Sequence, residues 1–144
     1  INLKKHRIIF VHVRRTDYLH TPSIKFPAVI NINWYKKMMK LIKKKIKKPI
    51  FIVMGDDHYY LQDCFQSSDH VIISKNNVEV DLSIMTYCSA GILSPSSFAW
   101  WGAFYAQKYN LDSKSIFIAP KYWCGHRQKK WNPKNFYTSW INYL

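Results

Sequence analysis

The sequence predicts an α/β domain built on a Rossmann-like parallel sheet, and three observations support that prediction. Short apolar runs rich in β-branched residues alternate with longer segments whose apolar residues recur at helical spacing. Most of the apolar runs end in Ser, Pro, Gly or charged residues, which are typical of the loops after strands. The chain of 144 residues is long enough for one such domain and short for two, and its 48% hydrophobic and 17% aromatic content excludes a disordered protein.

The first half of the chain predicts three strands and two helices. The strands are short apolar runs, at residues 7–13, 50–54 and 71–73. A long loop follows the first strand and leads into a lysine-rich helix, which Asn33 or its neighbour can cap and which Pro49 ends. A short helix at residues 59–65 then joins the second strand to the third.

The second half continues the alternation. A helix at 81–88 precedes a buried strand at 90–93, and the most apolar helix, at 98–109, precedes a final strand at 115–119. Residues 121–144 have weaker periodicity. Strands joined by helical crossovers imply a parallel sheet of about five strands with right-handed connections.

The net charge of +14 is large, and eight of the 22 basic residues lie between Lys36 and Lys48. The favoured interpretation is an amphipathic helix with a solvated lysine face, and the alternative is attraction to nucleic acid or anionic lipid. No RNA-binding signature is present, so we expect no nucleic-acid partner. No apolar run approaches the roughly 18 residues of a membrane span. The three cysteines lack C-x-x-C spacing and are odd in number, which excludes a disulfide framework or a zinc ribbon but leaves one disulfide open.

Two adjacent arginines, Arg14 and Arg15, follow the first predicted strand directly. A guanidinium group pairs bidentately with phosphate and stays charged at physiological pH. If strand geometry persists the two side chains point to opposite faces, so one could face a diphosphate while the other braces Asp17 or the loop. The alternative is a pair of surface salt bridges. His12 is either a packing residue or a catalytic one, and Asp17 either orients an arginine or acts as a base.

Asp56 and Asp57 follow the second strand, where a carboxylate often contacts the ribose or the base in Rossmann-like sheets. Capping of the next helix and ligation of a metal together with His58 are the alternatives. The chain has no D-x-D pattern, and we therefore expect no metal.

Three serines lie between a buried strand and the apolar helix that begins near Phe98: Ser94, Ser96 and Ser97. Hydroxyls and backbone N–H groups at a helix start favour anions, while helix capping alone is the alternative. No G-x-S-x-G elbow is present to support a hydrolase serine. Trp100 and Trp101 are adjacent on this helix, so we expect one in the core and the other near the site.

Together these segments resemble the α-1,2-fucosyltransferases, relatives of the blood-group H enzymes. Residues matching that family's His-x-Arg-Arg-x-Asp-Tyr motif are His12, Arg14, Arg15, Asp17 and Tyr18. Its second motif reads approximately Asn-Ser-Ser-Phe-Ser-Trp-Trp-Gly/Ala-Ala, and residues 96–98 and 100–103 match it. Asp56 with Asp57, Asp81 with Cys88, and residues 118–123 resemble further family segments. Two motifs in the family's order make the resemblance specific.

The sequence departs from the family pattern at three positions. Thr16 replaces a common glycine, Pro95 stands where asparagine is usual, and Ala99 stands where serine is usual. The last two changes remove side-chain hydrogen bonds. Any ligand contact there must therefore come from Ser94, Ser96, Ser97 or the backbone.

The resemblance implies that residues 1–144 are the C-terminal, donor-binding half of a GT-B glycosyltransferase whose acceptor half is absent from this chain. L-Fucose would pass from GDP-fucose, with inversion and without metal, to the 2-hydroxyl of a galactose-terminated glycan. The implied catalytic residues are Arg14, Asp17 and His12. The implied donor-binding residues are Arg14, Arg15, Asp56, Asp57, Ser94, Ser96, Ser97 and Phe98.

Several features of the whole protein stay open at this point. The catalytic base and a membrane anchor could both lie in an N-terminal region that precedes this chain, which begins without methionine. The compartment would be the Golgi lumen in a eukaryote and the cytoplasm in a bacterium. The alternatives to this function are fucosyl transfer with another linkage, a non-catalytic nucleotide-sugar-binding fragment and a basic nucleic-acid-binding module.

Overall fold

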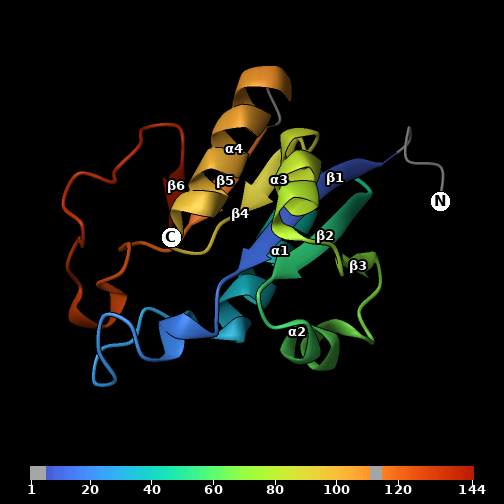
Figure 1. The fold of residues 1–144 in the computed structure, drawn as a ribbon. Helices are drawn as coiled ribbons and strands as arrows, with labels where there is room; N and C mark the ends of the chain where they lie inside the picture. The colour runs from blue at the N-terminus through green and yellow to red at the C-terminus, as the bar shows by residue number, and fades with distance from the viewer. Residues whose placement is uncertain (1–5, 111–114) are drawn as a thin grey trace.

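One parallel sheet organises the computed structural model, which describes residues 6–110 and 115–144 (Figure 1). The described residues form six strands: β1 (Arg7–Val13), β2 (Pro49–Gly55), β3 (Val71–Ile73), β4 (Ala90–Ile92), β5 (Phe117–Ala119) and β6 (Asn142–Tyr143). All neighbouring pairs are parallel, and the order across the sheet is β3-β2-β1-β4-β5-β6. The predicted Rossmann-like α/β class is confirmed. Because the chain reverses its direction across the sheet between β3 and β4, the switch point lies between β1 and β4, where ligands bind in such sheets.

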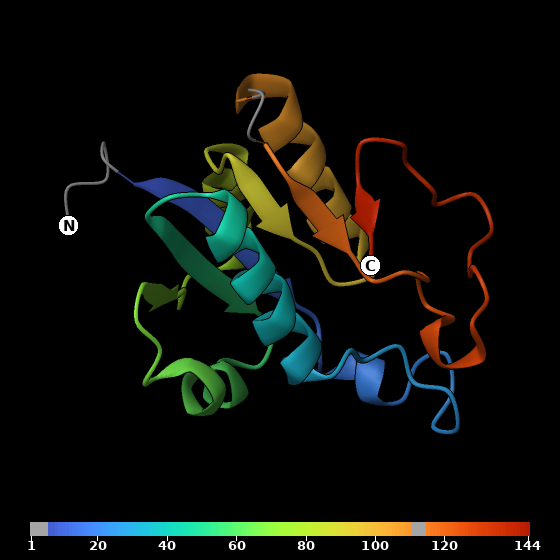
Figure 2. The ribbon, with the colours of Figure 1, turned by 180° about the vertical axis from the view of Figure 1, so that it is seen from behind.

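Four α-helices in the described residues cover the two faces of the sheet: α1 (Ile32–Lys45), α2 (His58–Phe65), α3 (Val78–Thr86) and α4 (Ser97–Asn110). Helices α3 and α4 lie in front of the sheet in Figure 1, and α1 lies in front of it in the opposite view of Figure 2. Two single 3-10 turns, η2 (Asp17–Leu19) and η3 (His126–Gln128), lie in the loops after β1 and β5. No helix in the described part of the chain has the length and apolarity to cross a membrane.

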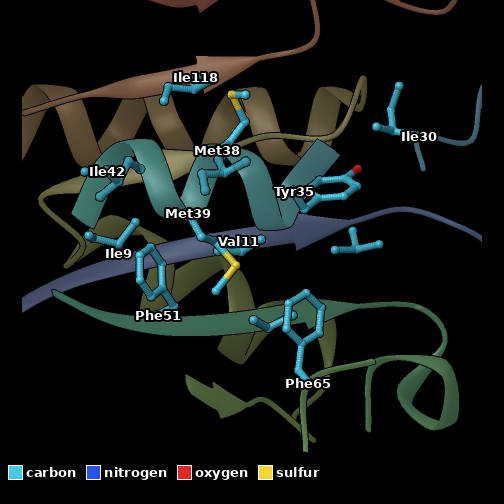
Figure 3. Packing of buried hydrophobic residues seen from close by; sticks show 14 of the residues in the cluster. Ile9, Val11, Ile30, Tyr35, Met38, Met39, Ile42, Phe51, Phe65 and Ile118 are labelled. Atoms are coloured by element: carbon cyan, nitrogen blue, oxygen red, sulfur yellow. The ribbon is translucent and has the colours of Figure 1, made fainter. Parts of the chain in front are cut away.

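Alternate residues of β1 divide the core into two clusters. Ile9, Val11 and Val13 point toward α1 and α2, whose inward residues include Tyr35 and Phe65, as Figure 3 shows. The intervening residues of β1 point the other way, toward the cluster formed with α3 and α4. Most lysines of α1 are exposed, so the predicted amphipathic helix with a solvated lysine face is confirmed.

Several predicted boundaries are wrong, each for a local reason. Helix α1 is capped by Asn31, whose side chain accepts from the Asn33 N–H, and it ends at Lys45 before Pro49 opens β2. Helix α3 begins earlier than expected because Asn77 caps it. The sheet has a sixth strand beyond the predicted five, and this two-residue strand is too short to produce any periodicity in the sequence.

Candidate active site

A cavity of about 380 Å³ lies at the carboxyl ends of the central strands. Its walls are the ends of β1 and β2, the turn before α3 and the first turn of α4. Five of the residues predicted from the sequence line it: His12, Arg14, Asp56, Ser96 and Phe98. The switch point of the sheet thus carries the side chains that the two sequence motifs supplied.

The pleat of β1 decides which residues reach this cavity. Phe10 points toward α3 and α4, and with a period of two the same face takes His12 and then Arg14. The pairing of β1 with β2 ends at Val13 and Gly55, which brings the next residue, Asp56, beside the arginine loop. The strand register, rather than the loop alone, sets the geometry of the site.

Arg14 is held by two carboxylates at the wall of the cavity. Its Nε lies 2.8 Å from Asp17 Oδ1 and 3.4 Å from Asp56 Oδ2, and its guanidinium carbon lies 5.8 Å from the centre of the Tyr18 ring. The hydrogen bond to Asp17 raises the pKa of Arg14 above its ordinary value. Arg14 is therefore a fixed positive charge that faces the cavity.

Asp56 fastens the loop that follows β1. One carboxylate oxygen accepts the Arg15 N–H at 2.8 Å, and the other accepts the Thr16 N–H at 3.0 Å and the Thr16 hydroxyl. Burial alone would raise the pKa of Asp56, but these hydrogen bonds and the charge of Arg14 together lower it. Asp56 is thus ionised and ties the ends of β1 and β2 together, while part of it still faces the cavity.

Arg15 points away from Arg14, as the strand geometry predicts. It forms an ion pair with Asp57 Oδ2 at 2.8 Å, and its guanidinium carbon lies 4.1 Å from the centre of the Tyr60 ring. Asp57 also caps α2 through the Tyr60 N–H at 3.0 Å. One arginine is expected from the sequence to face a diphosphate while the other braces Asp17 or the loop. Arg14 itself lines the cavity and pairs with Asp17, whereas Arg15 braces the turn before α2 through Asp57.

His12 and Ser94 form a buried pair beneath the cavity. His12 Nδ1 lies 2.7 Å from Ser94 Oγ, and the imidazole centre is 5.2 Å from that of the Phe98 ring. Burial lowers the pKa of His12 to about 4, with the charge of Arg14 acting in the same direction and Asp56 opposing it. The imidazole is therefore neutral at pH 7, and Ser94, which is fully buried, is committed to holding it.

A second hydrogen bond, besides that between His12 and Ser94, joins the arginine motif to the serine segment. The Tyr18 hydroxyl donates to the backbone carbonyl of Pro95 at 2.7 Å. This bond crosses from the arginine loop to the serine loop, so the segment with Pro95 in place of the family's asparagine is still anchored. Ser97 is exposed on the far side of α4's first turn and does not line this cavity.

Asp81 is a cavity residue that the sequence reasoning did not select as a site residue. It belongs to α3, is only 5% exposed, and accepts a hydrogen bond from the Ser74 hydroxyl at 2.5 Å. Burial raises its pKa, and the Ser74 hydroxyl and the charge of His58 oppose that effect only in part. The sequence carries no clear local signal for this role, because the same helix also holds Glu79, Ser83 and Thr86.

The electrostatics of the cavity favour an anion at one end and hydrogen-bond donors at the other. Arg14 and the N-terminal turn of α4 supply positive potential, because the first N–H groups of a helix have no partner within the helix. Asp81, in the first turn of α3, adds a carboxylate to the lining. Within the described ranges, no group of three His, Cys, Asp or Glu side chains is placed to hold a metal ion.

The parallel sheet with helices on both faces is a Rossmann-like domain, and the cavity at its switch point is its candidate ligand site. The chain belongs to glycosyl transferase family 11, whose family model matches residues 1–144. Two similar Escherichia coli proteins are an O-antigen biosynthesis glycosyltransferase WbnK, 27% identical over 92% of this chain and 43% of its own length, and an alpha-1,2-colitosyltransferase, 32% identical over 80% and 40%. A galactoside alpha-(1,2)-fucosyltransferase 1 of Mus musculus is 27% identical over 72% and 29%.

The chain spans less than half the length of these curated relatives. No solved structure matches it. The resemblance to the α-1,2-fucosyltransferases that the two motifs indicate is confirmed by the family match and by the relatives' names.

Proposed function

We propose that this chain is the donor-binding half of a GT-B fucosyltransferase that moves L-fucose from GDP-fucose to the 2-hydroxyl of a terminal galactose, with inversion. The observation that carries the proposal is the cavity with Arg14 at one wall and buried Asp81 at another. Membership of glycosyl transferase family 11 and the names of the mammalian relatives support the transfer chemistry.

The diphosphate lies between Arg14 and the first turn of α4 in this proposal. Charge develops on the departing diphosphate as the bond to fucose breaks, and a fixed guanidinium with helix N–H groups stabilises that charge without a metal ion. Ser96, buried at the cavity wall, adds a hydroxyl there. Asp17 and His12 act as positioning residues: Asp17 orients Arg14, and neutral His12 fixes Ser94.

The nucleoside lies toward α3. Guanine presents two adjacent N–H donors on one edge, and a carboxylate accepts both, which suits Asp81. Asp56 also lines the cavity and is the candidate for a ribose contact, whereas Asp57 is turned toward Arg15 and α2. This arrangement assigns the two ends of GDP to the two ends of the cavity.

The reaction is a single displacement. The acceptor oxygen attacks the anomeric carbon of fucose, the bond to the diphosphate oxygen breaks, GDP leaves with the electron pair, and the hydroxyl proton passes to a base. At a pKa of about 4, His12 is a weak base whose Nδ1 already faces Ser94. We therefore place the base in the part of the protein outside this chain.

A second candidate differs only in the sugar that is transferred. The alpha-1,2-colitosyltransferase is 32% identical over 80% of this chain. Transfer of colitose would use the same nucleotide cavity, and the two donors are separated by competition between them in the transfer assay.

The first test is calorimetric titration of the protein with GDP-fucose. Replacing Arg14 by alanine removes a charge-assisted contact and should weaken binding roughly 10- to 100-fold, because such contacts contribute about 1.5–3 kcal/mol. The matched control is Arg127→Ala, since Arg127 is exposed and outside the cavity. Equal affinity in both variants would contradict the proposed phosphate site.

The base contact is tested with GDP and inosine diphosphate, which lacks the exocyclic amino group of guanine. The wild-type protein should prefer GDP, and Asp81→Asn should lose that preference by roughly 5- to 100-fold, the range for a bidentate contact to a base. If Asp81→Asn weakens both nucleotides equally, Asp81 has a structural role and the guanine assignment is wrong. Transfer of labelled fucose to galactosides by the full-length protein, with linkage analysis by NMR, tests the reaction itself.

A further inference from the structure

A second cavity lies on the other side of the first turn of α4. It has a volume of about 250 Å³ and is lined by Ser97, Trp100, Trp101, Asn135, Phe136 and Thr138. The three helix residues stand at positions i, i+3 and i+4 and therefore share one face of α4, while Ser96 and Phe98 face the donor cavity. One helical turn is thus the partition between the two cavities.

The walls of this second cavity are aromatic and held in place. The Trp100 and Trp101 rings meet edge to face at 5.0 Å and 90°, so two indole surfaces stand at right angles. Trp100 Nε1 donates to Thr138 Oγ1 at 3.0 Å, which fixes that ring and satisfies its N–H group. Trp101 is 48% exposed, which leaves a large apolar surface in contact with water.

The rim of the cavity is polar and uncharged. Ser97 and Asn135 are exposed there and offer a hydroxyl and an amide, and no lining residue carries a charge. A diphosphate or a carboxylate finds no countercharge here. A saccharide, in contrast, has an apolar C–H face and neutral hydroxyls at its edge, and its weakly positive C–H bonds complement the negative face of an indole ring. Binding sites for small ligands typically combine apolar or aromatic walls with a few polar groups, and this cavity has that composition.

We propose that this second cavity is the subsite for a neutral sugar ring of the acceptor glycan. The volume lies below the roughly 300–1,000 Å³ of sites for drug-sized ligands, which suits a single ring. Because Ser96 lines one cavity and the next residue, Ser97, lines the other, both cavities adjoin the first turn of α4. The ring stacks on Trp101, and its hydroxyls bond to Asn135 and Ser97. This inference rests on the proposed function for the identity of the sugar as acceptor.

Substitution of Trp101 is the sharpest test, because its ring is half exposed and its removal leaves the Trp100–Thr138 bond intact. In the full-length protein, Trp101→Ala should raise the acceptor KM roughly fivefold to tenfold and leave the affinity for GDP-fucose unchanged. Trp101→Phe, which keeps an aromatic face, should recover part of the loss. Tyr109→Ala is the matched control, since Tyr109 is an exposed ring of the same helix outside the cavity.

A binding readout separates failure of this inference from failure of the proposed function. Methyl β-galactoside is titrated into the same protein while the indole N–H signals are followed by NMR, with Trp101→Phe used to assign the Trp101 signal. A shift of that signal, with weaker binding in Trp101→Ala and none of these changes in Tyr109→Ala, supports the subsite. No shift, or equal binding in Trp101→Ala, overturns the subsite even if fucose is transferred. Galactoside binding at Trp101 without any fucosyl transfer would refute the proposed function and leave a saccharide site standing.

Discussion

Replacing Asp56 by asparagine separates two roles that a carboxylate can have at this position. As the structure has it, Asp56 accepts the backbone N–H groups of Arg15 and Thr16 and fastens the arginine loop to the end of β2. If Asp56 instead mainly contacted the nucleotide base, its substitution would change nucleotide selectivity and have little effect on stability. The isosteric change keeps the shape of the side chain, so that the difference measured is electrostatic.

The expected loss of stability follows from the hydrogen bonds. Asparagine keeps one oxygen acceptor, but its NH₂ group must face one of the two backbone donors or the Arg14 guanidinium, 3.4 Å from Asp56 Oδ2. Loss of a charge-assisted hydrogen bond at this part-buried site costs about 2 kcal/mol. At roughly 4 °C per kcal/mol for a domain near this size, the midpoint of thermal unfolding falls by about 8 °C.

The assay is thermal unfolding, with urea unfolding for the free energy, of Asp56→Asn beside Asp57→Asn. The Asp57 change keeps a cap for α2 and removes only the partly exposed pair with Arg15, which should cost about 1 kcal/mol or less. GDP affinity should fall in Asp56→Asn because Arg14 loses a neighbour that positions it, while the ratio of GDP to inosine diphosphate affinity stays constant. Unchanged stability together with an altered ratio would refute the brace and favour base reading by Asp56.

Two further predictions concern His12 and the glycines. Because burial lowers the pKa of His12 to about 4 from 6.5, the unfolded state binds more protons between these values, so stability falls by about 3 kcal/mol as pH drops from 6.5 to 4. The free energy of unfolding of His12→Asn, measured against pH, should lack this slope; an identical slope would show that His12 is not its source. A Cβ on Gly55 would lie 2.1 Å from the Val13 carbonyl oxygen, so Gly55→Ala should cost about 2 kcal/mol or more. Gly102→Ala meets the flexible Met85 thioether instead and should cost less in the same urea experiment; equal losses would contradict the backbone clash.

Strand periodicity explains how much of the site could be predicted from the sequence. The run before Arg14 fixed β1 at its observed bounds, and alternation along it placed Arg14 and Arg15 on opposite faces. The contact between His12 and Ser94 joins residues 82 apart in the chain, and such a contact depends on the order of strands in the sheet. No short segment of the sequence specifies the order of the strands, so the contact between His12 and Ser94 could not be predicted from it.

Asp81 shows a different limit of sequence reasoning. Its helix begins at Val78, three residues before the predicted start, because Asn77 caps it. With the predicted start, Asp81 stands at the helix terminus, where an acid needs no further explanation. With the observed start it lies in the first turn on the buried side, bonded to Ser74 and facing the cavity, and its burial then requires a partner.

The two carboxylates beside Arg14 differ in how firmly they are held, and that difference decides what an incoming diphosphate displaces. Asp17 and Arg14 are both substantially exposed, at 49% and 36% for their side chains, and an ion pair of that kind contributes about 1 kcal/mol or less. Asp56 is 17% exposed and is fixed by two backbone N–H groups as well as by Thr16. In the proposed donor complex, a diphosphate would present several charged oxygens to the same guanidinium and would replace Asp17 at small cost, while Asp56 would stay in place. Arg14 is thus oriented by both carboxylates in this structure, and the proposed function predicts that donor binding breaks only its weaker contact, the one with Asp17.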